Sequence, residues 1–391
     1  MASARNTAMG TDHGYKPENR EVPGVLIRLL ESADVRLDGD RPWDIQVRDP
    51  AFYDRIIRHG SVGLGESYMD KAWESEHLDE TFHKLLRVDL NTRIRGLAKL
   101  RFLRLFLRSL LFNRQSRRRA FQVGKHHYDI GNDVYAAMLD PTMSYSCGYW
   151  KDAADLAQAQ RAKLRLICDK LELEPGERLL DIGCGWGGLA RFAARDYGVE
   201  VTGITVSKEQ QGFAQAHCAG LPVTIELMDY RDLTGRFDKV VSVGMFEHVG
   251  PKNYSAYFAA VERVLAAHGL FLLHTIGSCE TTHASDAWLD KYIFPNGKIP
   301  SAQQITHPLE PSFVIEDWHN FGQDYDATLM AWWKNFDAAW PRLADKYDER
   351  FYRMFKYYLN CCAGYFRSRQ GQLWQLVLSK RGRRAIYRSI R

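Results

Sequence analysis

Residues 179–190, LLDIGCGWGGLA, constrain the fold of this 391-residue chain more than any other segment. A short apolar run ends at Asp181, and Gly183, Gly185 and Gly187 follow at alternating positions before a predicted helix. Glycine adopts positive φ angles and lets backbone amides approach a ligand closely. A helix that begins directly after such a turn points its N-terminus at the ligand. The segment therefore predicts a strand, a ligand-binding turn and a helix.

Strands and helices alternate around this turn. Apolar runs predict strands over residues 178–182, 199–205, 223–228, 237–243 and 269–274. Helical patterns lie between or before them, for example over residues 155–170 and 254–267. This alternation predicts an α/β fold with a doubly wound, mostly parallel sheet.

The glycine spacing indicates the kind of ligand. G-x-G-x-G differs from the G-x-G-x-x-G of dinucleotide-binding turns. It resembles motif I of Rossmann-like methyltransferases that use S-adenosylmethionine, which has no pyrophosphate. We therefore predict the fold of these enzymes, the alternative being a tight turn without a ligand.

Polar residues follow the other predicted strands, at the sheet edge where such folds bind their ligands. Asp229 comes after the third strand, where it could accept a hydrogen bond from an adenine amino group, and Tyr230 offers a flat contact. After the second strand, many relatives carry a carboxylate for the ribose. This chain has Thr205, Ser207 and Gln210 there, so the ribose contact is left open.

Two titratable residues lie at the ends of the last two predicted strands: Glu247 follows the fourth strand, and His274 is the last residue of the fifth. Residues 143–148, with Cys147, precede the sheet and are expected to cover the cofactor, whereas residues 316–325 are aromatic and could form a pocket wall. Each has a structural alternative: a helix cap, a hydrogen-bonded core histidine or a packed thiol. Their convergence on one sheet edge favours a site.

Several longer strings resemble the bacterial cyclopropane-fatty-acyl-phospholipid synthases. They are KHHYDIGNDVY, YSCGYW, VSVGMFEHVGPKNY, LLHTIGS, KYIFPNGKIPS, EDWHNFGQDYDATLMAW and YYLNCCAGYFR. The resemblance begins near Gln122 and reaches almost to the C-terminus, with the mycolic acid cyclopropane synthases as more distant relatives. The N-terminal region resembles the extra domain of the phospholipid-acting branch.

The resemblance implies a reaction. A methylene group would pass from S-adenosylmethionine to the cis double bond of an unsaturated phospholipid acyl chain, with bound bicarbonate as the proton acceptor. The residues that would hold bicarbonate are Cys147, Glu247, His274, Ile276 and Tyr325. All of these except Ile276 are the implied catalytic residues, together with Cys362, for which packing in a helix is the favoured alternative.

The implied cofactor contacts combine the strand-end residues with positions matched to the family. They are Tyr145, Ser146, Asp181, Gly183, Gly185, Thr205, Gln210, Asp229, Tyr230 and Arg231. No metal is expected. An apolar acyl channel or, equally, ordinary core would account for the aromatic residues Tyr292, Phe294, Trp318, Phe321, Trp332 and Trp333.

The positive charge is concentrated in one segment. Between Arg93 and Arg119 there are ten basic residues and no acid, and the remaining 43 basic residues are outnumbered by 48 acidic ones. Arg101, Arg104 and Arg108 recur at helical spacing among leucines and phenylalanines. Such a helix would bind an anionic membrane surface or would be buried with its arginines reaching solvent. The interleaved apolar residues favour lipid over nucleic acid.

These patterns predict a helical N-terminal domain over residues 1–112, a linker over 113–120 and a catalytic domain over 121–391. The N-terminal domain would place the protein on the membrane and help form a homodimer. With no signal-like segment, no long apolar run and seven cysteines without a CxxC pair, we expect a cytoplasmic protein, peripheral on the inner face of the cytoplasmic membrane. The alternatives are an N- or O-methyltransferase of a small molecule or RNA, and a non-catalytic, membrane-associated cofactor-binding protein.

Overall fold

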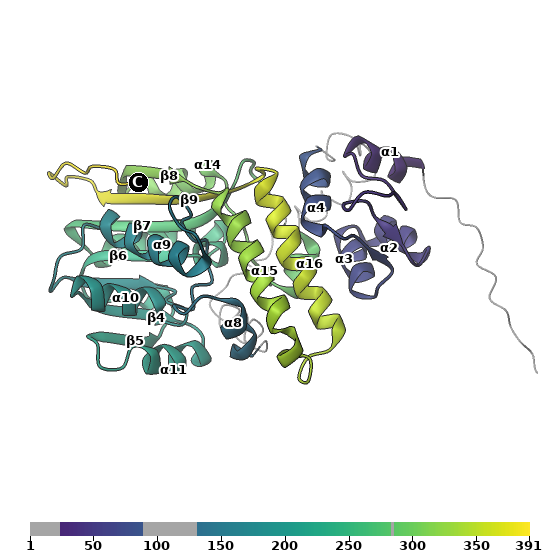
Figure 1. Cartoon of the computed structure of the whole chain (residues 1–391). Coiled ribbons are helices and arrows are strands. Elements are labelled where there is room, and N and C mark those ends of the chain that lie inside the picture. The colour runs from purple at the N-terminus through teal and green to yellow at the C-terminus, as the bar shows by residue number, and fades with distance from the viewer. Residues whose placement is uncertain (1–23, 89–130, 283–284) are drawn as a thin grey trace, which may run out of the picture.

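The computed structural model describes residues 24–88, 131–282 and 285–391 (Figure 1). The predicted basic segment between Arg93 and Arg119 and the predicted linker over residues 113–120 lie outside the described residues. Among the helices in the described ranges, none is long and apolar enough to cross a lipid bilayer.

A seven-stranded sheet forms the centre of the catalytic part, in the order β5-β4-β3-β6-β7-β9-β8. Neighbouring strands from β5 to β7 are parallel, whereas β9 is antiparallel to both β7 and β8. The predicted α/β fold with a mostly parallel sheet is therefore confirmed. The strands are β3 Arg178–Ile182, β4 Glu200–Thr205, β5 Val223–Leu227, β6 Phe237–Val243, β7 Leu265–Ser278, β8 Phe313–Asn320 and β9 Gly371–Lys380.

Alternating side chains of the strands bury two cores, one on each face of the sheet. Leu179 and Val241 pack with residues of α9 and α10, whereas Leu180 and Val240 pack with residues of α12 and α14. This alternation follows from the two-residue period of a strand. The helices around the sheet are α9 Leu156–Lys170, α10 Gly188–Tyr197, α11 Lys208–His217, α12 Tyr254–Val264 and α14 Ala302–Leu309, with the short 3-10 helices η1 Tyr230–Asp232, η2 Phe246–His248 and η3 Pro251–Asn253.

Two long helices separate the sheet from the N-terminal elements (Figure 1). They are α15 Asp324–Leu343 and α16 Glu349–Arg367, and the shorter α8 Asn132–Met138 and α13 Ala287–Tyr292 belong to the same buried cluster. The N-terminal part contains α1 Gly24–Ser32, β1 Gln46–Val47, α2 Ala51–His59, α3 Ser61–Met69, β2 Trp73–Glu74 and α4 Leu78–Arg87, with β1 and β2 paired antiparallel.

Helix α16 packs closely against α4. A Cβ atom on Gly364 would lie 2.7 Å from the backbone nitrogen of His83, so only glycine allows this approach. The Arg367 guanidinium then forms ion pairs with Asp79 of α4 at 2.7 Å and with Asp326 of α15 at 2.8 Å. The N-terminal elements and the C-terminal helices thus share one core, and the division into domains stays a prediction.

The predicted elements differ from the observed ones mainly after β6. The strands predicted over 178–182 and 237–243 match β3 and β6. The helix predicted over 254–267 ends at Val264, because Leu265 already begins β7. Residues 316–325 do not form a pocket wall throughout: their first part belongs to the edge strand β8, and only their last part begins α15.

Candidate active site

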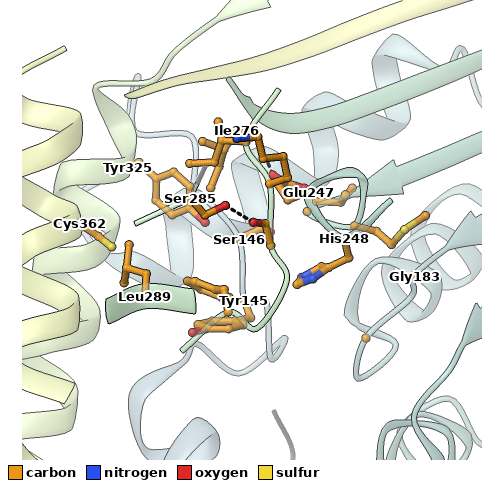
Figure 2. Close-up of a pocket in the computed structure, with 18 of the residues that line it drawn as sticks. Tyr145, Ser146, Gly183, Glu247, His248, Ile276, Ser285, Leu289, Tyr325 and Cys362 are labelled. Carbon is orange, nitrogen blue, oxygen red and sulfur yellow. Dashed lines mark hydrogen bonds between the residues drawn. The ribbon is translucent and has the colours of Figure 1, made fainter. Parts of the chain in front are cut away.

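A cavity of about 930 Å³ lies at the carboxyl ends of the parallel strands (Figure 2). Ile182, Thr205 and Val243 line it at the ends of β3, β4 and β6, and Tyr358 and Cys362 of α16 line it from the other side. Ligands of doubly wound sheets bind at this edge. The cavity is therefore the candidate active site.

The glycine-rich turn forms one wall of the cavity. Gly183, Gly185 and Gly187 have φ angles of 85°, 55° and 83°, which side chains other than glycine rarely adopt. A Cβ atom on Gly183 would also lie 2.7 Å from the side chain of Met245. Because α10 begins immediately after this turn, its N-terminal amides face the same wall.

A buried charged pair lies beneath the turn. Asp181 is the penultimate residue of β3 and is 2% exposed, and its Oδ2 atom has no hydrogen-bond partner among the described residues. Burial raises the pKa of Asp181 to about 7, although Lys163 of α9 acts to lower it. Burial also lowers the pKa of Lys163 to about 8, and the Lys163 Nζ atom donates a hydrogen bond to Ser146 Oγ at 3.0 Å. The unpartnered carboxylate oxygen is available to a donor group of a ligand.

The polar residues after β4 and β5 hold one another in place. Thr205 donates to Gln210 Oε1 at 2.8 Å, and Arg231 forms an ion pair with Asp229 at 2.8 Å. The Arg231 guanidinium also lies 4.6 Å from the centroid of the Tyr230 ring. All ten residues predicted to contact the cofactor line this cavity, while their contact with a cofactor stays a prediction. They are Tyr145, Ser146, Asp181, Gly183, Gly185, Thr205, Gln210, Asp229, Tyr230 and Arg231.

Glu247 presents a half-satisfied carboxyl group to the cavity. Its Oε1 atom accepts a hydrogen bond from the backbone N–H of Ile276 at 2.7 Å (Figure 2). Its Oε2 atom has no hydrogen-bond partner in the part of the chain that the structure describes. Burial raises the pKa of Glu247, and the Ile276 N–H partly opposes this rise. Of the five residues predicted to bind bicarbonate, Glu247, Ile276 and Tyr325 line the cavity, while their contact with bicarbonate stays a prediction.

Two residues of that predicted site do not line the cavity. Cys147 is fully buried, with its Sγ atom 3.8 Å from Thr328 Oγ1, and burial raises the pKa of its thiol. His274 lies on β7, where its Nδ1 atom is 3.2 Å from Gln375 Nε2, and burial lowers its pKa so that the ring is neutral. The structure thus places both behind the wall, and their catalytic role stays a prediction. In the described ranges, no group of three His, Cys, Asp or Glu side chains could hold a metal ion.

Cys362 lines the cavity from α16. Burial raises the pKa of its thiol to about 12, with a smaller contribution from Asp286. A thiol with this pKa is protonated at neutral pH, which disfavours a nucleophilic role. Nearby, the hydroxyl groups of Tyr145 and Tyr358 are 2.8 Å apart and close the wall between the cofactor side and α16.

The aromatic residues proposed for an acyl channel mostly belong to the core. Of the six, Phe294 lines the cavity. Trp332 lies behind Tyr145, with 5.2 Å between ring centroids, and Trp318 packs against Trp374 of β9 at 5.2 Å. The ordinary-core alternative therefore holds for Trp318 and Trp332. Tyr292, Phe321 and Trp333 likewise pack in or against the buried cluster of the C-terminal helices and are not among the lining residues.

Sequence reasoning missed several lining residues. Lys163, His248, Lys298 and residues 85–88 at the end of α4 all face the cavity. The sequence contained a signal for Lys163, because it lies four residues before Ile167 and therefore on the same apolar face of the predicted helix. For residues 85–88 no local signal exists, because their place depends on how α4 packs against α16.

Comparison with known proteins gives one consistent result. Residues 115–376 match the family model described as mycolic acid cyclopropane synthetase. The cyclopropane-fatty-acyl-phospholipid synthase of Escherichia coli K12 is 58% identical over 356 residues, which cover 91% of this chain and 93% of the relative.

Solved structures agree with the sequence matches. The cyclopropane synthase MmaA2 from Mycobacterium tuberculosis superimposes with a TM-score of 0.63 at 30% identity, covering 66% of this chain and 98% of MmaA2. The mycolic acid cyclopropane synthase CmaA1, solved with S-adenosylhomocysteine and CTAB, gives 0.62 at 32% identity, covering 67% and 98%.

Proposed function

Because this chain belongs to the mycolic acid cyclopropane synthetase family, we propose that it converts cis double bonds of phospholipid acyl chains into cyclopropane rings. It is a methyltransferase that uses S-adenosylmethionine. The overall change adds a CH₂ group: the double bond gains a methyl carbon, one proton leaves that carbon, and the ring closes.

The cavity wall fits the cofactor. Bound S-adenosylmethionine supplies an electrophilic methyl group on a sulfonium centre. The turn keeps glycine at positions 183 and 185, where φ is positive, so backbone amides would be free to approach the cofactor. Among the described residues the Oδ2 atom of Asp181 has no partner, so it would accept from a cofactor donor group. Lys163 and Gln160 hold the Ser146 hydroxyl and carbonyl groups, and so fix the segment that covers this side of the cavity.

We assign Glu247 to the site that holds the proton acceptor. Glu247 lines the cavity, and its buried Oε2 atom has no hydrogen-bond partner among the described residues, while the Ile276 N–H fixes the orientation of the carboxyl group. Bicarbonate bound between Glu247 and Tyr325 would accept the proton that leaves the added methyl group. The raised pKa of Glu247 favours a shared proton between the carboxyl group and such an anion.

Aromatic residues in the rest of the wall would stabilise positive charge on the acyl chain. Tyr145, Tyr325, Phe294 and Tyr358 surround the cavity with aromatic rings. Aromatic faces attract cations, and a dry pocket strengthens every electrostatic interaction inside it. These rings would therefore stabilise the positive charge that develops when the alkene attacks the sulfonium methyl group.

We also propose the arrangement at the membrane. The basic segment between Arg93 and Arg119 would bind the anionic inner face of the cytoplasmic membrane, and a homodimer would hold the enzyme there. No nucleic acid partner is proposed.

The half-satisfied Glu247 carboxyl group in a cofactor-binding cavity is the observation that carries this function. Purified protein, incubated with dioleoyl phosphatidylglycerol vesicles and S-adenosylmethionine, should yield acyl chains that are heavier by one CH₂ group and resist ozonolysis. The Glu247→Gln variant should lose about 10²-fold or more in kcat, with S-adenosylmethionine affinity changed less than about twofold.

Removal of dissolved carbon dioxide should lower the wild-type rate, and added bicarbonate should restore it. Cofactor binding without a change in the acyl chains would contradict the proposed reaction. An unchanged rate in bicarbonate-free buffer would contradict the proposed base alone.

A further inference from the structure

Lys298 is a buried cation in the wall of the cavity. It lies between α13 and α14, is 7% exposed, and belongs to the residues that line the cavity. Its backbone N–H donates to the carbonyl oxygen of Glu247 at 2.7 Å, which ties this loop to the proposed catalytic segment. The position of Lys298 relative to the reacting groups is therefore fixed by the fold.

The other buried lysines have acidic groups to balance their charge. Lys170 is 3.2 Å from Asp317, Lys239 is 3.5 Å from Glu177, and Lys163 experiences the charges of Asp140 and Asp181. Each of these ammonium groups is thus compensated within the protein.

Lys298 has no such compensation among the described residues. Its Nζ atom donates one hydrogen bond, to Thr282 Oγ1 at 3.3 Å, and forms no ion pair within 4.0 Å. Burial alone lowers the pKa of Lys298 to about 8. Glu280, Asp286 and Asp290 also line the cavity, but Asp286 accepts from the N–H groups of α13 and Asp290 accepts from the N–H of Asn296 at 2.8 Å. A buried cation without an anion is costly, so the site is suited to an anionic group of a ligand.

The surroundings of Lys298 are polar on one side and apolar on the other. Thr282 contacts its ammonium group, and the Ser285 hydroxyl donates to the carbonyl oxygen of the adjacent Gly297. Leu289 and Phe294, from the same stretch of chain, add apolar surface to the cavity. One region thus offers hydroxyl groups and a cation beside a wall that suits hydrocarbon, as an amphiphilic ligand requires.

We propose that Lys298 binds the phosphodiester group of the substrate lipid and makes the enzyme selective for phospholipids over neutral glycerolipids. This inference rests on the proposed function and deepens it. The cofactor is the other anionic candidate, because it carries a carboxylate, but most of its predicted contacts lie at the turn after β3 and near the ends of β4 and β5, and the other two are Tyr145 and Ser146. The lipid is the ligand whose apolar chain and anionic group match both sides of this region.

The test separates substrate recognition from membrane binding. The substrate lipid is presented as a minor component in vesicles of saturated phosphatidylglycerol, which has no double bond and keeps the surface charge constant. Wild-type enzyme should convert dioleoyl phosphatidylglycerol about tenfold more efficiently, in kcat/KM, than dioleoylglycerol. Lys298→Met should remove most of this preference, and Lys298→Arg should keep it.

Lys334→Met is the matched control, since Lys334 lies on the exposed side of α15 and does not line the cavity. It should keep the wild-type preference. Thermal unfolding without lipid gives a readout besides activity: Lys298→Met should raise Tm, because it removes an uncompensated buried charge. A fall in Tm would show that the protein itself balances the charge of Lys298, and would overturn the inference.

The remaining outcomes are distinguishable. If Lys298→Met forms cyclopropane lipids with the wild-type preference for phosphodiester, Lys298 does not bind the headgroup and the inference is wrong. If inorganic phosphate alters wild-type activity but not that of Lys298→Met, while both share one lipid preference, the ligand is free phosphate and the inference is also wrong. If wild-type enzyme converts neither lipid, the proposed function itself fails.

Discussion

Two buried residues on the cofactor side of the cavity, Asp181 and Lys163, change their protonation near neutral pH. Burial raises the pKa of Asp181 to about 7 and lowers that of Lys163 to about 8, so both titrate near neutral pH. The positive charge of Lys163 favours the ionised form of Asp181. The protonation state of Asp181 therefore depends on Lys163. The ammonium group of Lys163 also donates a hydrogen bond to Ser146, in the segment that is expected to cover the cofactor.

S-adenosylmethionine affinity should therefore depend on pH. If ionised Asp181 accepts a hydrogen bond from the cofactor, the Kd should rise by up to about tenfold per pH unit as the pH falls below about 7. Lys163→Met should move the start of this rise to higher pH, because loss of the positive charge raises the pKa of Asp181. Calorimetric titration between pH 5.5 and 8.5, a range of roughly three units, measures both curves.

Ser146→Ala provides the matched control, since it removes the bond to Lys163 but leaves the charge in place. It should weaken binding by a similar factor at every pH. A wild-type Kd that stays constant across the range would show that Asp181 does not contact the cofactor through its ionised form.

Residue types near strand ends could be predicted from the sequence, whereas side-chain directions could not. Strand ends and family motifs together gave the ten predicted cofactor residues, and all of them line the cavity. Cys147 and His274 do not line the cavity: the Cys147 thiol donates to the carbonyl oxygen of Gly148, and the His274 ring lies against Gln375 of the neighbouring strand β9. Lys163 was missed because a lysine in a helix usually indicates a solvated position.

At the scale of elements, the parallel strands were predictable and the antiparallel ones were not. β3, β4, β5 and β6 are short apolar runs between helices, which the pattern identifies directly. β9 lies between β7 and β8 although it follows two long helices in the chain. Its place depends on contacts between distant segments, and no local periodicity reports these.

The contact between α16 and α4 supports the cavity wall. Tyr358 and Cys362 reach the cavity from α16, and the end of α4 lines it as well. The approach of the two helices depends on Gly364, since a Cβ atom there would lie 2.7 Å from Phe82 Cβ and from the His83 backbone nitrogen. The spacing of these helices therefore affects both stability and the acyl-binding wall.

Gly364→Ala should destabilise the protein by about 1–3 kcal/mol, because the added methyl group forces the helices apart. It should also lower kcat/KM for lipid more than it lowers S-adenosylmethionine affinity. The control is Gly212→Ala in α11, where the added methyl group would meet no described atom within 4 Å beyond its chain neighbours and the adjacent backbone of its own helix. That variant should gain about 0.5–1 kcal/mol from helix propensity. Urea unfolding measures the free energy of unfolding of both variants. If Gly364→Ala were as stable as the wild-type protein, the close packing of α16 against α4 would not require glycine.

At the scale of the whole molecule, charge is separated along the chain. Ten basic residues without an acid lie between Arg93 and Arg119, while acidic residues outnumber basic ones elsewhere. The segment begins shortly after α4, whose end lines the cavity. The proposed membrane-binding segment is therefore close in sequence to a helix end that lines the proposed acyl site.

Replacing Arg101, Arg104 and Arg108 by glutamine should weaken binding to phosphatidylglycerol vesicles about a hundredfold, at about 1 kcal/mol for each arginine. Activity on substrate dispersed in detergent should be retained. Sedimentation with vesicles measures the binding. The control replaces three exposed arginines elsewhere by glutamine, namely Arg58, Arg342 and Arg388. Equal losses in both variants would show that net charge, and not the segment, controls binding.

The fate of the transferred methyl group tests the central chemistry most directly. Wild-type enzyme is incubated with dioleoyl phosphatidylglycerol vesicles and S-adenosylmethionine that carries a trideuterated methyl group, and the acyl products are fragmented by mass spectrometry. We expect a ring carbon at the former double bond that has lost one deuteron and kept the others. An added carbon that keeps every deuteron as a methyl branch, or label found in the headgroup, would contradict this expectation.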